Sequence, residues 1–203
     1  MYDAYIYWAV AAVCAYLIGS IPTGYIIVKL LKGEDIRTVG SGSTGATNVK
    51  RVLGKGWFFT TMVLDTIKGA APVFLAGLLA EEFGATFSVP SVIAAVMVLL
   101  GHSKPIFLRF KGGKSVASGV GVLIALCWQA GLIVAAIWAA VTYITRYVSV
   151  GSIVAISLSP LLMWLFHKPL IYVLYCALGA VYIIYLHREN IARLRKGEES
   201  KVR

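Results

Sequence analysis

Long apolar segments, separated by short clusters of charged residues, are the feature that most restricts how this chain can fold. A helix needs about 20 mostly apolar residues to cross a bilayer, and several stretches of the chain have about that length. Only 14% of the residues are charged, against about 25% in an ordinary soluble domain. So little polar surface cannot cover a water-soluble core, and lipid must be part of the solvent. Because lipid offers no partner to unpaired backbone groups, the sequence predicts an all-α, polytopic membrane helix bundle.

The apolar segments predict about seven transmembrane helices. We place them at Ala4–Leu30, Trp57–Ala80, Ser91–Leu108, Gly113–Trp128, Ala130–Tyr147, Ser149–Phe166 and Pro169–Leu186. Pro22 and Gly24 are expected to kink the first. The fourth is short for a full crossing, and a tilted or partly re-entrant segment remains open. We treat residues 1–203 as one membrane-embedded domain and expect the tail at 197–203 to be flexible.

The distribution of positive charge predicts how the chain is oriented. Seven spans place most Lys and Arg residues on one side, including the basic tail, while the other side keeps Lys168. Such asymmetry is the positive-inside pattern of membrane proteins. Joining the fourth and fifth spans, which are separated only around Gln129, would send the tail to the opposite side. We therefore predict an outside N-terminus and a cytoplasmic C-terminus.

The first polar segment on the predicted cytoplasmic side is a Gly/Ser-rich loop followed by basic residues. Its candidate binding residues are Ser41, Gly42, Ser43, Gly45, Thr47, Asn48 and Lys55. Glycines let backbone N–H groups converge without Cβ obstruction, which suits phosphate oxygens. A plain flexible linker is the alternative. The Thr-Asn ending and the basic cluster after it favour anion binding.

The second polar segment combines basic residues with paired glycines before an apolar helix. Its candidate residues are His102, Lys104, Arg109, Gly112, Gly113, Lys114 and Ser115. The start of a helix beside a lysine is a ready anion site. A Walker A loop is excluded, because Leu108 stands where its first glycine is required and no strand precedes it. A positive-inside loop would explain the charges but not the glycines.

The third polar segment follows the last span. On a helix, His187, Asn190, Ile191 and Leu194 share a face. A basic interfacial helix that anchors the tail is the alternative, although polar His and Asn side chains are unusual on an apolar stripe. Inside the second span, Asp65 and Lys68 are spaced to form a buried ion pair.

Several function classes find no support in the sequence. The histidines His102, His167 and His187 have no His or Cys partner at metal-ligand spacing, so we expect no metal and no cofactor. No Gly-x-Ser-x-Gly nucleophile elbow occurs, and no histidine is followed five positions later by Asp. The net charge of +10 fits basic cytoplasmic loops and anionic lipid better than nucleic acid.

The three polar segments together resemble the bacterial acyl-phosphate:glycerol-3-phosphate acyltransferase family. Its first motif, roughly Ser-Gly-Asn-x-Gly-Ala-Thr-Asn, matches residues 41–48, with Ser43 in place of Asn. Its second, roughly Lys-Gly-Gly-Lys-Gly-Val-Ala, matches residues 111–117, with Ser115 in place of Gly. Its third, roughly His-x-x-Asn-Ile-x-Arg-Leu, matches residues 187–194. The two departures keep a small polar residue.

The resemblance implies a specific reaction and location. Such an enzyme transfers an acyl group from acyl phosphate to the 1-hydroxyl of glycerol 3-phosphate, giving lysophosphatidic acid and phosphate for phospholipid biosynthesis. Neither acyl-CoA nor acyl carrier protein is the direct donor. The expected location is the bacterial cytoplasmic (inner) membrane, with the active site at the cytoplasmic interface. The alternative function is a small membrane anion (phosphate) transporter, whose binding groups would lie near the bilayer midplane.

The resemblance also assigns hypothetical roles. The first segment would bind phosphate, while Lys104, Arg109 and Lys114 would neutralise phosphates and developing charge. Gly112 and Gly113 would offer backbone donors, helped by Ser115. His187 and Asn190 would orient glycerol 3-phosphate. The proton acceptor is left open between His102, His187 and a substrate phosphate oxygen.

Overall fold

The structure, a computed structural model, describes residues 2–83 and 87–202, and all regular structure in that part of the chain is helical. This confirms the all-α prediction. The elements are α1 (Tyr2–Ser20), α2 (Thr23–Lys32), η1 (Ile36–Thr38), α3 (Ala46–Leu53), α4 (Lys55–Leu78), η2 (Glu81–Phe83), α5 (Ser88–Ser103), η3 (Ile106–Leu108), α6 (Val116–Leu126), α7 (Trp128–Thr145), α8 (Val148–Ser157), α9 (Ser159–Leu165), α10 (Leu170–Leu186) and α11 (Arg188–Arg195).

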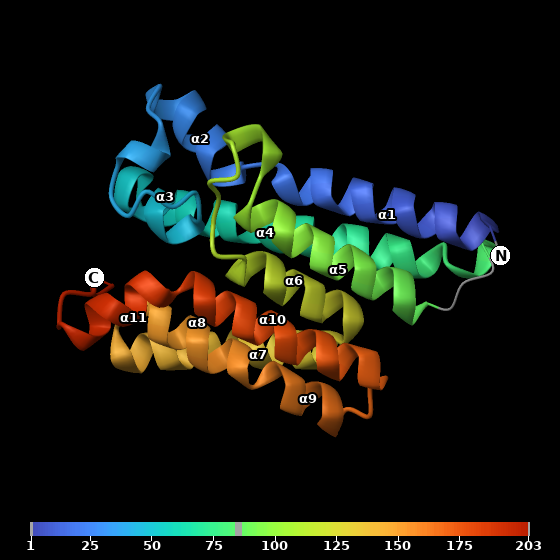
Figure 1. The fold of residues 1–203 in the computed structure, drawn as a ribbon. Coiled ribbons are helices and arrows are strands. Elements are labelled where there is room, and N and C mark those ends of the chain that lie inside the picture. Colours follow the sequence, from blue (N-terminus) through green and yellow to red (C-terminus); the bar gives the residue numbers. More distant parts are fainter. Residues whose placement is uncertain (1, 84–86, 203) are drawn as a thin grey trace.

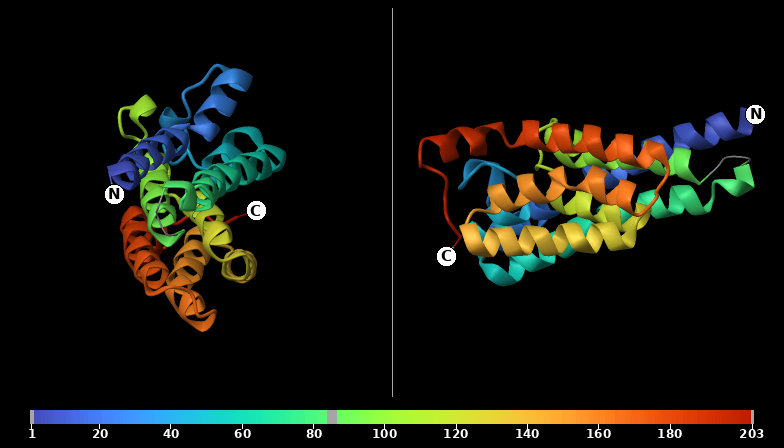
Figure 2. Two further views of the ribbon diagram at one scale, coloured as in Figure 1. Left: turned by 90° about the vertical axis from the view of Figure 1, so that its right-hand side faces the viewer. Right: turned by 90° about the horizontal axis from the view of Figure 1, so that it is seen from below.

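The long helices run side by side along one axis, with the two chain ends at opposite ends of the bundle (Figures 1 and 2). An odd number of crossings gives this placement of the termini. Helices α1, α4 and α5 form one side of the bundle, helices α7 to α10 form the other, and α6 lies between α4 and α7.

Within the described residues, five helical segments are long and apolar enough to cross a membrane, with α1–α2 and α8–α9 each counted as one. A sixth is possible if α10 and α11, bent by 56°, form one span. Helix α6 has 11 residues, about 16 Å at 1.5 Å per residue, well short of a bilayer core. Each predicted span corresponds to one or more helices of the structure. The number seven and the orientation of the termini stay predictions.

The breaks between helices have identifiable causes. The first span is interrupted at Pro22, which has no N–H to donate, whereas Gly24 lies within α2. The carbonyl of Ile21 accepts from the Lys68 ammonium, 2.8 Å away, and from the Thr23 amide at 3.1 Å. Lys68 also pairs with Asp65 at 2.9 Å, as the sequence predicts. An extended backbone at Cys127 (φ −161°) separates α6 from α7.

Small residues let α4 and α6 pack closely. A Cβ added to Gly69 would lie 2.1 Å from the carbonyl oxygen of Ser118, and one added to Gly121 would lie 2.0 Å from that of Thr66. Close approach through small residues is typical of helix pairs in membranes. It fixes α6, and with it the segment that precedes α6, against the longest helix of the bundle.

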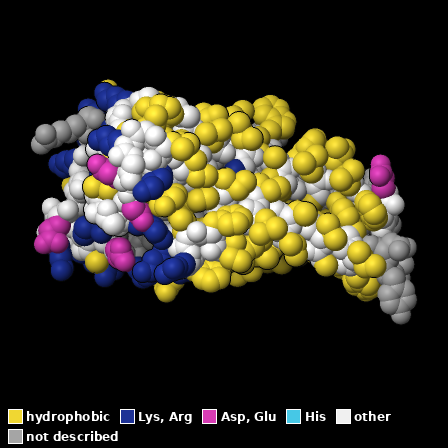
Figure 3. Space-filling model, turned by 90° about the horizontal axis from the view of Figure 1, so that it is seen from above, with side chains coloured by type: hydrophobic (Ala, Val, Ile, Leu, Met, Phe, Trp, Pro, Cys, Tyr) yellow, Lys and Arg dark blue, Asp and Glu magenta, His cyan; other side chains and the backbone are white. Residues whose placement is uncertain are grey.

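The surface divides into an apolar body and a charged end. Hydrophobic side chains cover most of the length of the molecule in Figure 3, whereas Lys and Arg gather at the end where α2, α3 and α11 lie in Figure 1. Exposed apolar side chains on many helices, such as Leu30, Ile144 and Leu178, suit contact with lipid rather than water.

Candidate active site

The three polar segments meet at the charged end of the bundle. The Lys114 ammonium of the second segment donates a hydrogen bond to the Asn190 side-chain oxygen of the third. The first segment reaches the second through Arg37, whose Nη1 lies 3.3 Å from the carbonyl oxygen of Leu108. The second segment thus contacts the third at Lys114, and at Leu108 it contacts Arg37, which lies just before the first segment.

In the first segment, the side chain of Asn48 holds the loop together. It is 1% exposed. Its Nδ2 donates to the carbonyls of Val39 (2.9 Å) and Ser43 (3.0 Å) and also lies 3.1 Å from that of Ile36. Its Oδ1 accepts from the Ser41 amide at 3.0 Å. We expected Asn48 to contact the ligand, but its amide group is committed to the loop backbone.

The other candidate residues of this segment are at least partly accessible. Ser41 and Gly42 are exposed, as is Lys55 at the start of α4, while Ser43, Gly45 and Thr47 are partly buried. Gly42 needs a positive φ (68°) that favours glycine. The loop then enters α3 through Gly45, so Thr47 lies in the first turn of that helix. These residues stay candidates for phosphate binding.

In the second segment, the paired glycines pack against the end of α5. The Gly112 amide donates to the Ser103 carbonyl at 3.2 Å, and the Gly113 amide donates to the His102 carbonyl at 3.0 Å. Both amides are used within the protein, contrary to the expectation that they would donate to a substrate. A Cβ at Gly113 would lie 2.2 Å from Nε2 of His102. Close packing therefore explains the two glycines.

Ser115 is also turned inward, whereas the basic residues of the segment are not. Ser115 is fully buried and donates from Oγ to the Leu99 carbonyl at 2.9 Å. Its φ of 59° is in the left-handed region, where Gly is the easiest residue. Lys104 and Arg109 are exposed, and Lys114 is partly buried.

His102 lies near a serine and an aspartate, but these residues do not form a catalytic triad. Its Nδ1 is 3.1 Å from Ser118 Oγ and 3.8 Å from Asp65 Oδ1. A relay needs the serine and the carboxylate on opposite ring nitrogens, and here both face the same one. Nε2 of His102 packs against Gly113, and Nδ1 faces Ser118 and Asp65, so both ring nitrogens face the protein rather than a substrate.

In the third segment, His187 stands at the junction of α10 and α11. It is 3% exposed, and its Nδ1 lies 2.8 Å from the Ile183 carbonyl. A carbonyl can only accept, so Nδ1 carries the proton, and Nε2 has a free lone pair when the ring is neutral. Asn190 follows in the first turn of α11 and is also buried.

The tail also contributes to this part of the site. The sequence did not predict this contribution. Glu199 Oε1 accepts from Asn190 Nδ2 at 2.6 Å and from Ser149 Oγ at 2.8 Å. Its Oε2 accepts from Arg193 Nε at 2.7 Å. Nothing in a lone serine within an apolar helix, or in a glutamate near the chain end, marks either as part of a site. The segment expected to be flexible thus makes specific contacts with the bundle.

The charges around Lys114 are mixed. Burial lowers the pKa of the Lys114 ammonium, and the positive charges of Arg193 and Arg51 lower it further, while Glu199 and Glu189 raise it. Burial raises the pKa of the Glu199 carboxyl, but its hydrogen bonds outweigh this effect, so that pKa is lowered. Arg51, from α3, has the smallest of these effects on the pKa of Lys114.

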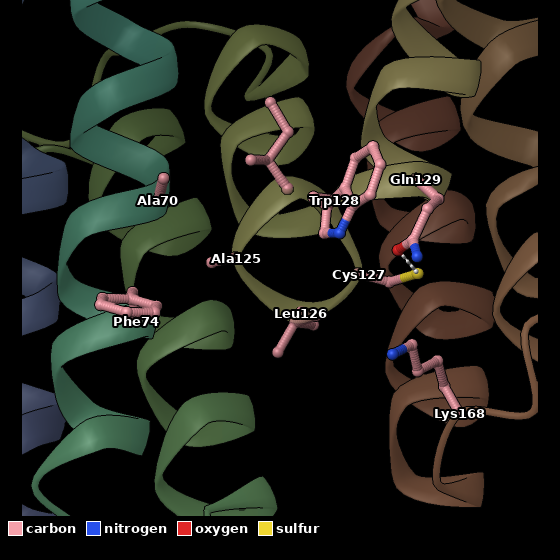
Figure 4. Close-up of a pocket in the computed structure, with 9 residues that line it drawn as sticks. Ala70, Phe74, Ala125, Leu126, Cys127, Trp128, Gln129 and Lys168 are labelled. Atoms are coloured by element: carbon pink, nitrogen blue, oxygen red, sulfur yellow. Dashed lines mark hydrogen bonds between the residues drawn. The ribbon is translucent and has the colours of Figure 1, made fainter.

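A cavity of about 470 Å³ lies elsewhere, beyond the last turn of α6 (Figure 4). It is lined by Ala70, Phe74, Ile124, Ala125, Leu126, Cys127, Trp128, Gln129 and Lys168. Because Lys114 precedes the first turn of α6, this cavity is separate from the candidate site. Among the residues that the structure describes, no group of three or more His, Cys, Asp or Glu side chains could hold a metal ion.

Comparison with known proteins gives consistent matches. Residues 9–197 match a protein-family model described as glycerol-3-phosphate acyltransferase. Curated relatives of that name include proteins from Gloeobacter violaceus (46% identity, 93% of this chain and 91% of the relative) and Synechococcus sp. strain JA-3-3Ab (44% identity, 95% and 92%). Among solved structures, the chain resembles PlsY, an integral membrane glycerol 3-phosphate acyltransferase. Its glycerol 3-phosphate form superposes with a TM-score of 0.89 at 37% identity, covering 97% of this chain and 96% of PlsY. Its lysophosphatidic acid form gives 0.86 at 35% identity, covering 97% and 95%.

Proposed function

The chain belongs to the glycerol-3-phosphate acyltransferase family and is a multi-pass membrane enzyme of that activity, and on this premise we propose that its acyl donor is an acyl phosphate. The reaction transfers the acyl group to the 1-hydroxyl of glycerol 3-phosphate. The hydroxyl oxygen forms a bond to the acyl carbon, and the bond from that carbon to the phosphate oxygen breaks. The products are lysophosphatidic acid and inorganic phosphate.

One observation carries this proposal: Lys114 hydrogen-bonds Asn190 at the charged end, and the same second segment is reached at Leu108 by Arg37, just before the first segment. Both proposed substrates carry phosphate, so a cluster of cations and hydrogen-bond donors can bind them next to each other. Acyl phosphate is an activated anhydride, so no covalent enzyme intermediate is needed. The lack of a Ser118–His102–Asp65 relay is compatible with direct attack.

Roles follow from charge and position at the charged end, where the Asn190 amide would exchange its contact with Lys114 for one with substrate. Lys114, with the exposed Lys104 and Arg109, would neutralise phosphate and the charge that develops on the attacked carbonyl. His187 and Asn190 would orient glycerol 3-phosphate.

The other candidate residues divide into two groups. Those still proposed to bind phosphate are Ser41, Gly42, Ser43, Gly45, Thr47 and Lys55. Those proposed to support the site from below are Asn48, His102, Gly112, Gly113 and Ser115. The proton of the 1-hydroxyl would pass to Nε2 of His187 or to a substrate phosphate oxygen.

Location and organisation form part of the same proposal. The charged end would face the cytoplasm, in the inner membrane of a bacterium, with residues 1–203 acting as one domain. The positive-inside asymmetry supports this orientation. A site at one end of the bundle suits a water-soluble substrate meeting a membrane-borne acyl chain. It differs from the midplane site expected of a transporter.

The donor is tested with purified protein and radiolabelled glycerol 3-phosphate. We expect labelled lysophosphatidic acid with acyl phosphate, and none with acyl-CoA or acyl-acyl carrier protein. Lys114→Ala should abolish product formation. The matched control is Lys168→Ala, which removes a lysine that lines the separate cavity. Product from acyl-CoA alone would overturn the donor proposal while leaving the family assignment intact.

A further inference from the structure

The cavity of about 470 Å³ exists because α6 is short. Helix α6 ends at Leu126 after 11 residues, and the chain turns back at Cys127 to begin α7. Helix α4, with 24 residues, continues past this point, so that Phe74 lines the cavity. The space that a longer helix would fill between α4 and α7 is left open. Its volume lies in the range of ligand pockets, about 300–1,000 Å³.

The two sides of this cavity differ in chemistry. Ala70 and Phe74 of α4 form an apolar side (Figure 4). Trp128 and Gln129 at the start of α7 lie on the other side, together with Lys168 from the loop between α9 and α10. No Asp or Glu side chain lines the cavity. The cavity is therefore apolar over most of its wall, with positive charge on one side only.

The polar groups of this cavity are not used by the protein. Lys168 is partly buried, and its ammonium forms no salt bridge with the side chains that the structure describes. The side-chain oxygen of Gln129 accepts from Cys127 Sγ at 3.4 Å, which leaves its NH₂ group as a donor. A partly buried cation without a counter-charge is unfavourable. An anion beside Lys168 and Gln129 would remove this cost.

The surroundings of the cavity point to the bilayer as the source of that anion. Phe74 and Trp128 are 51% and 60% exposed, and apolar side chains exposed on a membrane bundle face lipid. Lys168 lies just before α10, and His187 of the candidate site follows the other end of that helix. The 17 residues of α10 span about 25 Å. Lys168 therefore lies near the membrane surface opposite the charged end.

We propose that this cavity binds one anionic phospholipid from the leaflet opposite the charged end. The phosphate accepts hydrogen bonds from Lys168 and Gln129, and one acyl chain occupies the space between Phe74 of α4 and the start of α7. This lipid fills the gap beyond α6 and is not a substrate. The inference does not depend on which acyl donor the enzyme uses.

The position of the charge argues against the acyl chain of a substrate as the occupant. A chain whose phosphate is bound at Lys114 would first have to pass the whole of α6, about 16 Å. Its uncharged methyl end would then meet the Lys168 ammonium. A phospholipid that enters from the opposite surface instead places its phosphate at the cation and its apolar chain against Phe74.

The test uses a phosphatidylglycerol probe that carries a photoactivatable diazirine in one acyl chain. The purified full-length protein is irradiated with this probe in detergent, and cross-linked peptides are identified by mass spectrometry. We expect saturable labelling of residues 70–78 and 122–129, the segments around the cavity. A phosphatidylcholine probe of the same chain, which carries no net charge, should label these segments at least fivefold less.

Three lysine variants test the cation. Lys168→Ala should lower phosphatidylglycerol labelling of the two segments at least fivefold, and Lys168→Arg, which keeps the positive charge, should restore it. Lys32→Ala removes an exposed lysine from the charged end and is the matched control, with labelling expected to stay at the wild-type level.

A cavity-filling variant tests the space independently of the charge. Ala70→Phe adds an aromatic ring where Ala70 now lines the cavity, so labelling should be lost although Lys168 is intact. Added phosphatidylglycerol should raise the melting temperature of the wild-type protein more than added phosphatidylcholine does. Ala70→Phe and Lys168→Ala should both lose this difference between the two lipids.

Three results would overturn the inference. Equal labelling by the two probes, or unchanged labelling in Lys168→Ala, would show that no headgroup is recognised. Labelling that does not saturate would show only partitioning of the probe into detergent. Displacement of the probe by acyl phosphate would assign the cavity to the substrate chain. None of these results bears on the donor proposal, which is measured by product formation.

Discussion

Lys114, just before α6, donates a hydrogen bond to the side-chain oxygen of Asn190 in α11, 76 residues further along the chain. A partly buried ammonium is stabilised by such a partner, because an unpaired charge at low dielectric is costly. The contact joins a residue of the second motif to one of the third. It sets the position of a lysine whose pKa is lowered by burial.

Lys114 should control the alkaline limit of activity. Because its pKa is lowered, the ammonium loses its proton at a lower pH than an ordinary lysine, and phosphate binding should weaken there. Lys114→Arg keeps a positive charge at any accessible pH. We expect this variant to retain some activity and to extend the alkaline limb upward, as measured by kcat/KM across pH. An alkaline limb that does not move would mean that another group sets it.

Asn48 should matter for loop stability before it matters for binding. Asn48→Ala leaves buried carbonyls and the Ser41 amide without their partner, at a cost of about 2–4 kcal/mol in unfolding free energy. A lower melting temperature and faster hydrogen exchange at residues 36–45 should accompany lost activity. Ser41→Ala removes only an exposed hydroxyl and should leave the melting temperature unchanged. Wild-type stability in Asn48→Ala would contradict this assignment.

Gly113 and His102 should be energetically coupled. Gly113→Ala places a Cβ against the His102 ring, and overpacking of this kind costs about 1–3 kcal/mol. In Gly113→Ala/His102→Ala the ring is gone, so the combined loss of stability should be smaller than the sum of the single losses. Thermal unfolding of all four proteins measures the coupling. Additive losses of stability would show that the two residues are not energetically coupled.

Asp65 and Lys68 should behave as a buried pair. Asp65→Ala leaves the Lys68 ammonium without its counter-charge inside the bundle, and breaking such a pair from one side typically costs about 3–5 kcal/mol. In Asp65→Ala/Lys68→Met no charge is left behind, so part of the loss should be recovered. The cost that remains is the lost hydrogen bond from Lys68 to the Ile21 carbonyl at the Pro22 break. Melting temperatures measured in one detergent rank the stability of the three proteins. A double variant less stable than Asp65→Ala would refute this prediction.

Short-range and compositional signals gave reliable predictions for much of the fold. The apolar segments all became helices, the break followed Pro22, and the i, i+3 spacing of Asp65 and Lys68 formed the ion pair. Each of these depends on properties of nearby residues. The length of α6 was only partly predictable, because the turn at Gly112 and Gly113 is fixed by its contact with α5.

The clustering of the candidate residues was predictable from the sequence, but the role of each residue was not. Motif residues identified Lys114, His187 and Asn190 and placed them on the same side. The motifs did not show that the side chain of Asn48 is hydrogen-bonded to the backbone of the loop. Ser115 was noted as a departure from Gly, and the structure explains it as a left-handed residue with an internal hydrogen bond.

The sequence by itself determined that this chain is a helical membrane protein with its positive charge at one end, because hydropathy and charge are properties of local composition. It also identified the family, through residue types at fixed spacing. Only the tertiary structure decided which polar atoms remain free for a ligand, since that depends on partners far away in the chain. Asn190 shows this most directly: the orientation of its amide is set by Lys114 on one side and Glu199 on the other.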